Sequence, residues 1–474
     1  MASERITFGE WLPDQSGLAG ALTEAKNVIP VGSGYAPLPT AVDLSDAADA
    51  NLLTVFSGKF ATLTTMFAAS ATKLYKFDTG DLDLDVVSKS GNYTSTTRWS
   101  FVQFGSLVIG ANGKNKLQSF TLNSSSLFAD LNASAPTAKY VTIIRDFVVA
   151  ANVASHENKV YWSDINDPDD WTSGSGSQSD VQAIPDGGDV QGITGGEFGV
   201  VFLEKSIVRM QYIGSPLFFQ FDTISKNIGC YAPNSIVQYG NNSFFLSDDG
   251  FYVTNGQSVT PIGAEKVDRF FFDNANLSDL DGISSAVDPI NKLVIWSYTN
   301  NSGTKSLLIY NWQLQRWTQG DTTTDFIASA SQAGTDLEAL DVFNSSIDSL
   351  GTSLDSRIWS GGQFVLAGTN ATKVATFTGS SSTADIRTAD IGSKGNSIIQ
   401  LARPVVDAGS GSVSVASRIR ADEEITYSTA VAASTENRVP LRSVGKYHRL
   451  KLTPTGNWKT AIGMDIEIAS TGSR

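Results

Sequence analysis

The sequence predicts an all-β fold built around a β-propeller of six or seven blades. A short apolar run recurs seven times, and the first residues of successive runs are 43, 43, 47, 44, 56 and 51 residues apart. Each of these runs is the last of the short β-like runs in one repeat unit, and we call it a closing run. The closing runs are Lys73–Phe77, Lys116–Phe120, Lys159–Trp162, Ser206–Met210, Gly250–Val253, Ser306–Tyr310 and Arg357–Trp359. A period of about 40–50 residues that holds several short strands is typical of propeller blades.

A second set of short runs supports the same architecture. Most repeat units contain one of these runs in their middle. The runs are wholly apolar and rich in β-branched or aromatic residues: Leu107–Ile109, Phe147–Val149, Val200–Phe202, Phe244–Leu246 and Leu293–Trp296. Gly, Asn, Asp or Ser bounds each run and favours a turn there. A strand that is apolar on both faces suits a position between neighbouring blades. A series of β-sandwiches with the same spacing is the alternative.

The order of segments predicts three regions: an extended N-terminal arm at 1–50, the propeller body at 51–365 and a C-terminal β-rich domain at 366–474. Prolines at 30, 37 and 39 favour extended backbone in the arm. Because the arm also holds Trp11, Ile29 and Tyr35, we expect it to dock on a surface. Alternating strands after residue 396 predict a small β-sandwich or a peripheral sheet.

Composition indicates how the protein is stabilised and where it folds. The chain has 474 residues, 42 of them glycine, and a single cysteine, Cys230. No intrachain disulfide is available, so stability must come from burial or assembly, and the apolar surroundings of Cys230 predict an inert thiol. The N-terminal residues lack a signal-like apolar segment, and no run approaches 18 apolar residues. We therefore expect no membrane span and folding in a reducing cytoplasm.

Charge is unevenly distributed along the chain. The net charge is −14, but residues 395–474 carry ten Lys/Arg against seven Asp/Glu, which leaves 24 basic and 41 acidic residues in 1–394. Tight binding to DNA without sequence preference depends on basic groups. An acidic body therefore argues against such binding, and it is compatible with DNA that passes nearby without being held.

The connection after the third closing run is unusually acidic. Between residues 164 and 189 it has no Lys or Arg and seven aspartates: Asp164, Asp167, Asp169, Asp170, Asp180, Asp186 and Asp189. Loops of this length inside a compact fold are often functional. We expect this loop either to face a channel or to contact another subunit, and an outward solvated loop is the alternative.

The sequence shows little sign of catalysis. Only two histidines occur, His156 and His448, and neither has the spacing of a metal site or a catalytic triad. Phosphate-binding and dinucleotide-binding glycine motifs are missing, as are paired cysteines. The prediction is a protein that is not an enzyme, with no catalytic residues, no metal and no cofactor.

Two stretches resemble the tail hub or nozzle proteins of short-tailed bacteriophages, including the packaged-DNA stabilisation group. The first comprises Leu12–Gly17, Asn27–Pro30 and Gly34–Tyr35 in the arm. The second comprises Lys205–Gly214, Phe218–Phe221, Ile228–Pro233, Phe244–Tyr252 and Pro261–Val267. Together they cover about a sixth of the chain, and the C-terminal 80 residues are similar only in strand character.

The resemblance implies a structural virion protein, assembled in the host cytoplasm and located in the phage tail. It implies a homo-hexameric ring below the portal–adaptor complex that conducts genome DNA during ejection and helps retain it beforehand. The implied partners are the tail adaptor or connector protein, more distal tail proteins, and DNA passing through the channel without tight binding. The alternative is a carbohydrate-binding or glycan-cleaving propeller that acts as a receptor-binding tail component.

Overall fold

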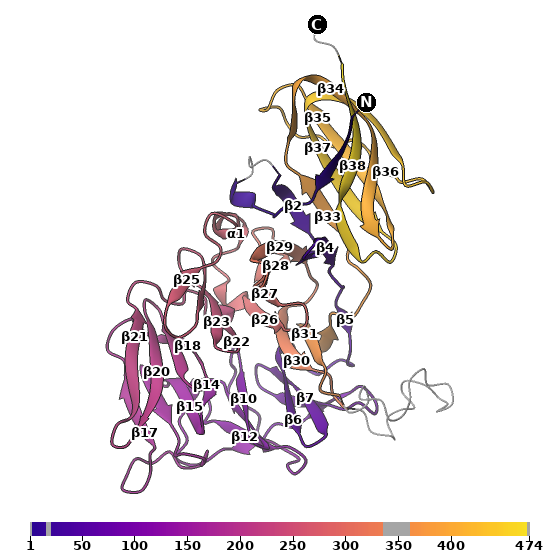
Figure 1. Cartoon of the computed structure of the whole chain (residues 1–474). Coiled ribbons are helices and arrows are strands. Elements are labelled where there is room, and N and C mark those ends of the chain that lie inside the picture. Colours follow the sequence, from indigo (N-terminus) through magenta and orange to yellow (C-terminus); the bar gives the residue numbers. More distant parts are fainter. Residues whose placement is uncertain (1, 16–19, 335–360, 472–474) are drawn as a thin grey trace.

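The computed structural model describes residues 2–15, 20–334 and 361–471. Six separate sheets of four antiparallel strands surround one axis. A further set of four antiparallel strands lies in the same ring but also belongs to a larger, 14-stranded sheet. This arrangement confirms the predicted propeller. Figure 1 shows the first strands β10, β14, β18, β22, β26 and β30 near the centre and the fourth strands β17, β21 and β25 at the outside. The apolar middle runs of the sequence form the second strands of their blades, as expected.

The first three blades follow the chain without interruption. Their strands are β6 (Leu52–Phe60), β7 (Leu63–Ser70), β8 (Leu74–Phe77), β9 (Leu84–Val86), β10 (Ser100–Phe104), β11 (Leu107–Ala111), β12 (Gln118–Thr121), β13 (Ala129–Asp130), β14 (Ala138–Ile144), β15 (Phe147–Val153), β16 (His156–Trp162) and β17 (Asp180–Ala183). Within each blade the strands pair in sequence order. Gly105, with a φ of 59°, makes the tight turn between β10 and β11.

The next three sets of strands continue this pattern. They are β18 (Val190–Thr194), β19 (Gly199–Leu203), β20 (Ile207–Gly214), β21 (Phe218–Ser225), β22 (Val237–Tyr239), β23 (Asn242–Leu246), β24 (Phe251–Thr254), β25 (Val259–Pro261), β26 (Ser284–Asp288), β27 (Leu293–Thr299), β28 (Lys305–Asn311) and β29 (Arg316–Asp321). A short helix, α1 (Asp268–Asn274), connects β25 to β26, and the turns η2 (Pro233–Ser235) and η3 (Leu280–Gly282) precede β22 and β26.

The last blade takes strands from both sides of the predicted 51–365 range. It pairs β30 (Phe326–Ser331), β31 (Phe364–Asn370) and β32 (Lys373–Thr376) with β5 (Val42–Asp43) from the arm. The predicted closing run Arg357–Trp359 lies outside the described residues, and β32 is the third strand of this blade. The ring closes against the first blade, where Ser331 N–H donates to Ser57 Oγ over 2.7 Å.

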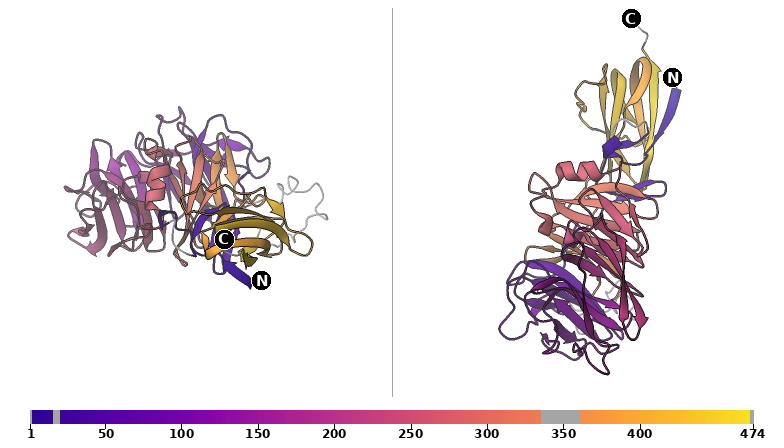
Figure 2. Two further views of the ribbon diagram at one scale, coloured as in Figure 1. Left: turned by 90° about the horizontal axis from the view of Figure 1, so that it is seen from above. Right: turned by 90° about the vertical axis from the view of Figure 1, so that its left-hand side faces the viewer.

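The C-terminal domain is a β-sandwich that stands on one side of the propeller (Figure 2). It contains β33 (Asp385–Thr388), β34 (Ile391–Asp407), β35 (Ser410–Arg418), β36 (Val431–Ala432), β37 (Val439–Thr455) and β38 (Thr460–Ser470). One half of β37 pairs with β34 and the other half with β35, so this strand belongs to both layers. Val413, Leu450 and Met464 are fully buried between the layers.

The N-terminal arm joins the two domains. Its elements are β1 (Ala2–Thr7), η1 (Pro13–Gln15), β2 (Leu22–Lys26), β3 (Val28–Val31) and β4 (Gly34–Pro37). Strand β1 pairs with β38 of the sandwich, and β2 lies between β29 of the propeller and β33. Trp11 and Tyr35 are fully buried and Ile29 is 8% exposed, so the expected docking of the arm is confirmed.

Candidate functional site

The acidic loop lies at the rim of the propeller. It connects β16 to β17, the outermost strand of its blade, and then leads into β18. Asp167, Asp169, Asp180, Asp186 and Asp189 are exposed, and Asp164 and Asp170 are half-buried. The loop is therefore far from the propeller's own axis, and its exposed carboxylates face solvent in the single chain.

Local hydrogen bonds explain much of the aspartate content of this loop. The Oδ1 atom of Asp167 accepts the N–H of Asp169 at 3.0 Å, and that of Asp170 accepts the N–H of Thr172 at 2.9 Å. Aspartate is favoured in such turns because its side chain accepts a backbone N–H two residues ahead. Trp171 is buried beneath the loop and donates from Nε1 to the carbonyl of Pro168 at 2.7 Å. The loop is an anchored structure with an acidic outer surface.

Charged side chains meet at one end of the propeller axis, where the first strands begin. Arg98 precedes β10 and donates from Nη1 across the ring to the carbonyl of Ile283, which precedes β26, over 2.8 Å. The Arg98 guanidinium carbon lies 5.1 Å from the centre of the Phe326 ring on β30, and Lys305 Nζ lies 5.3 Å from the same centre. Side chains from three blades therefore bridge the axis.

The electrostatics of this cluster are set by burial. Burial lowers the pKa of Arg98 to about 10 and also lowers the pKa of Lys305. In the described part of the chain, neither cation has a carboxylate within ion-pair distance. Burial raises the pKa of Tyr140, whose enclosed hydroxyl has no hydrogen-bond partner. At this end, therefore, the propeller axis carries cationic side chains and not the acidic wall that was expected for a DNA channel.

The junction between arm and propeller is polar and well defined. Asp14 accepts the N–H groups of Arg269 at 3.0 Å and Phe270 at 2.8 Å, which lie in the first turn of α1. Lys266 Nζ lies 2.6 Å from Glu10 Oε1. The Trp11 and Phe270 rings pack edge to face, with their centres 5.1 Å apart. These contacts fix the arm on the segment that begins α1.

Asp268 lies at the centre of this junction. Its Oδ1 atom accepts the N–H of Phe251 at 3.1 Å. The backbone of Gly263 passes so close that a Cβ there would lie 1.9 Å from Asp268 Oδ1. Burial raises the pKa of Asp268 to about 7, and the charges of Asp14 and Asp249 add to the shift.

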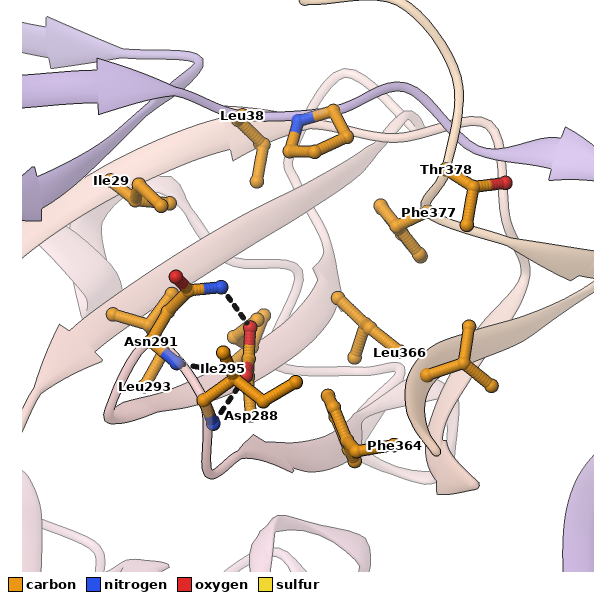
Figure 3. Close-up of a pocket in the computed structure, with 13 residues that line it drawn as sticks. Ile29, Leu38, Asp288, Asn291, Leu293, Ile295, Phe364, Leu366, Phe377 and Thr378 are labelled. Carbon is orange, nitrogen blue, oxygen red and sulfur yellow. Dashed lines mark hydrogen bonds between the residues drawn. The ribbon is translucent and has the colours of Figure 1, made fainter. Parts of the chain in front are cut away.

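An apolar groove of about 180 Å³ lies between β27 and β31, under the arm (Figure 3). Its apolar lining includes Ile29, Leu38, Leu293, Ile295, Phe364, Leu366 and Phe377. The carboxylate of Asp288 already accepts from the N–H groups of Ile290 and Asn291 and from the Asn291 amide. The Asp288 carboxylate is therefore already satisfied within the chain, and most of the lining is apolar.

The two histidines and the single cysteine lie in different parts of the molecule. His156 is exposed on β16, whereas His448 is fully buried between the hydroxyls of Ser397, 2.9 Å from Nε2, and Ser417, 2.7 Å from Nδ1. Cys230 is buried, and burial raises its pKa to about 12. Within the described ranges, no group of three or more His, Cys, Asp or Glu side chains is arranged to hold a metal ion, and no helix is long and apolar enough to cross a membrane.

Sequence reasoning did not identify Arg98, Tyr140 or Lys305. Their signal in the sequence is weak, since each is a single residue in or just before a strand, without a motif around it. Only the closure of the ring brings these positions together.

Comparison with known proteins finds only distant structural similarity. No protein-family model matches the chain, and no curated protein matches its sequence. Among solved structures, the Neurospora crassa Pan2 WD40 domain matches with a TM-score of 0.41 and 8% identity, over 72% of this chain and 96% of that one. The computationally designed Ika8 protein matches with a TM-score of 0.38 and 10% identity, over 79% and 99%. The strand topology, rather than these distant likenesses, identifies the propeller.

Proposed function

We propose that this chain is a structural subunit of a short phage tail and forms a hexameric hub or nozzle ring. The ring would conduct genome DNA during ejection and help retain it beforehand, with the tail adaptor and more distal tail proteins as neighbours in the virion. One observation carries the proposal: the two stretches that resemble this family contact each other through residues 250 positions apart in the sequence, Gln15 and Glu265.

The contact is specific. Asp14 of the arm stretch binds the first turn of α1, which directly follows the stretch Pro261–Val267. Gln15 Nε2 donates to the carbonyl of Glu265 within that stretch at 2.9 Å, and Asp14 N–H donates to the carbonyl of Lys266 at 3.2 Å. Of the remaining stretches, Lys205–Gly214, Phe218–Phe221 and Phe244–Tyr252 contribute to strands of the two blades that precede this junction, and Ile228–Pro233 connects those blades. Residues that resemble one family thus make one continuous structural unit.

The propeller axis is not the conduit in this proposal. It is bridged by Arg98, and its cationic groups would bind DNA phosphates instead of letting them slide. DNA would travel along the symmetry axis of the ring, between the subunits. The exposed carboxylates of the rim loop suit either the wall of that channel or a subunit contact, because acidic groups do not hold DNA.

Negative-stain imaging and native mass spectrometry of the full chain, alone and with its adaptor, test the proposal. We expect a six-fold ring with a central opening wide enough for duplex DNA. A protein that stays monomeric with the adaptor and shifts host polysaccharide on a native gel would support the carbohydrate-binding alternative instead.

A charge-reversal variant tests the rim loop. Asp169, Asp186 and Asp189 have exposed side chains without a hydrogen-bonding role, so replacing all three by lysine should leave the propeller folded. We expect the variant to bind duplex DNA more tightly or to assemble less well than the natural protein. The matched control changes the same charge at other exposed positions, Glu157, Glu424 and Glu436. Equal behaviour of the two variants would remove the rim loop from the proposal.

A further inference from the structure

Strand β21 differs from the other outermost strands of the propeller. It has eight residues, Phe218–Ser225, and among the strands described it pairs only with β20. The outermost strands β9, β13, β17, β25 and β5 have two to four residues each, and β29, which has six, is covered by β2. Short or covered edges protect a sheet against pairing with another chain. The edge of β21 has neither protection and lies at the outside of the ring (Figure 1).

A groove of about 520 Å³ lies beside this strand, between β21 and the segment that ends β17 of the preceding blade. Its apolar lining includes Ile184 and Val208, which are buried, and Phe221, which is half-buried. The volume is within the range of pockets that bind ligands. The groove and the open edge therefore form one continuous surface, which we call the rim groove.

The alternation of side chains along β21 determines what the rim groove can receive. Phe221 and Thr223, two positions apart, both line the groove. A strand added to the edge of β21 would extend the blade by a fifth strand, with every second side chain on the groove face. Apolar side chains at those positions would meet Phe221 and Val208. The surface thus fits an extended segment with apolar residues at alternate positions.

The exposed charges around the rim groove are mostly negative. Within two positions of a lining residue, the exposed acidic residues are Asp180, Asp186, Asp189, Glu204 and Asp222, and the exposed basic residues are Lys205 and Lys226. None of them forms an ion pair within the described part of the chain. Complementary charge speeds association and selects the partner, so this surface favours a basic segment over an acidic one.

We propose that the rim groove binds an extended segment of a partner protein by strand addition to β21. The segment has apolar residues at alternate positions, with lysine or arginine between them. Backbone hydrogen bonds to the edge of β21 supply affinity, and the groove selects the apolar side chains. The site is independent of the role in a phage tail and needs no second copy of this chain.

Fluorescence anisotropy of the purified full chain with labelled synthetic peptides tests the site. The probe is a short peptide of alternating valine and lysine. A second peptide has proline in place of two valines, and a third has glutamate in place of the lysines. We expect saturable binding of the valine–lysine peptide and binding of the proline peptide that is weaker by about tenfold or more, because two backbone donors are lost. The glutamate peptide should also bind more weakly.

Hydrogen–deuterium exchange locates the bound peptide. We expect the valine–lysine peptide to slow exchange of the β21 amides and to leave those of β25 unchanged. Equal binding of the valine–lysine and proline peptides, or absence of saturable binding, overturns the proposal. Protection of β21 that rises with protein concentration in the absence of peptide would assign the edge to a second copy of this chain and would also overturn it.

A groove-filling variant tests the apolar contact. Thr223 is exposed on β21 and lines the groove, so Thr223→Trp places a ring where a side chain of the peptide should lie. We expect binding to weaken by about tenfold, which corresponds to the loss of one buried valine. Thr260→Trp is the matched control, because Thr260 is exposed on β25, the outermost strand of the next blade.

A charge-reversal variant decides the matter if Thr223→Trp does not fold. Asp186→Lys combined with Asp222→Lys changes two exposed side chains and should reverse the preference, so that the glutamate peptide binds more tightly than the valine–lysine peptide. Glu157→Lys combined with Glu436→Lys makes the same change of net charge elsewhere and should keep the original preference. The same preference in both charge variants would refute the assignment to the rim groove.

Discussion

The raised pKa of Asp268 makes the docking of the arm sensitive to pH. The pKa of this carboxyl moves from 3.8 to about 7, chiefly because of burial. The folded protein therefore holds the proton more tightly than the unfolded chain does. The stabilisation is complete below the unfolded pKa and is lost as the pH rises through the folded pKa. The junction should loosen between about pH 4 and pH 7.

The magnitude follows from the size of the shift. Three pKa units correspond to about 4 kcal/mol, and because the carboxyl is partly exposed we expect about half of this, ~2 kcal/mol. Asp268→Asn mimics the neutral carboxyl and keeps an acceptor for the N–H of Phe251. At pH 8 the junction of the variant should be more stable than that of the natural protein by about this amount, with no difference at pH 4.

Hydrogen–deuterium exchange of the α1 amides measures this local stability. A loss of about 2 kcal/mol raises the exchange rate about 30-fold after correction for the intrinsic pH dependence. Asp273→Asn is the control, because the Asp273 side chain is 68% exposed on the same helix and pairs weakly with Arg269 at 3.7 Å. Equal pH dependence in the natural protein and in Asp268→Asn would refute the reasoning.

Three further outcomes follow from burial and charge. Trp11→Ala should destabilise the docked arm by about 3–5 kcal/mol, seen as faster proteolysis of the first 40 residues. Cys230 should resist thiol reagents at pH 8 until the protein unfolds, because its folded-state pKa is about 12. Asp385→Asn should cost about 2 kcal/mol near neutral pH, measured by thermal unfolding of the C-terminal domain. Although burial opposes it, hydrogen bonding to Arg387 and Lys451 holds the pKa of Asp385 low, so the cost should shrink as the pH falls toward 3.

The repeat and the apolar strands could be predicted from the sequence because each blade is encoded locally. Leu293–Trp296, for example, is a buried strand with turn residues on both sides, and it forms part of β27. The arm was also predictable, since Trp11 and Tyr35 would be out of place in a solvated tail.

Contacts between distant segments were not predictable. The pairing of β5 with β32 joins Val42–Asp43 to Ala375–Thr376, and nothing in a two-residue strand specifies its partner. Arg98 likewise resembles any loop arginine until the ring brings it opposite Ile283. In the acidic loop the number of aspartates suggested a function, yet part of it reflects turn geometry at Asp167 and Asp170.

The pairings of the arm have a consequence for biosynthesis. Strand β5 finds its neighbour only after residue 376 has been made, and β1 finds β38 only after residue 470 has been made. A nascent chain on the ribosome therefore carries its first strands with open edges through nearly the whole of translation. A chain that stops early never covers those edges, and unpaired strand edges promote aggregation. Truncated products should therefore be prone to capture by chaperones or to degradation by proteases.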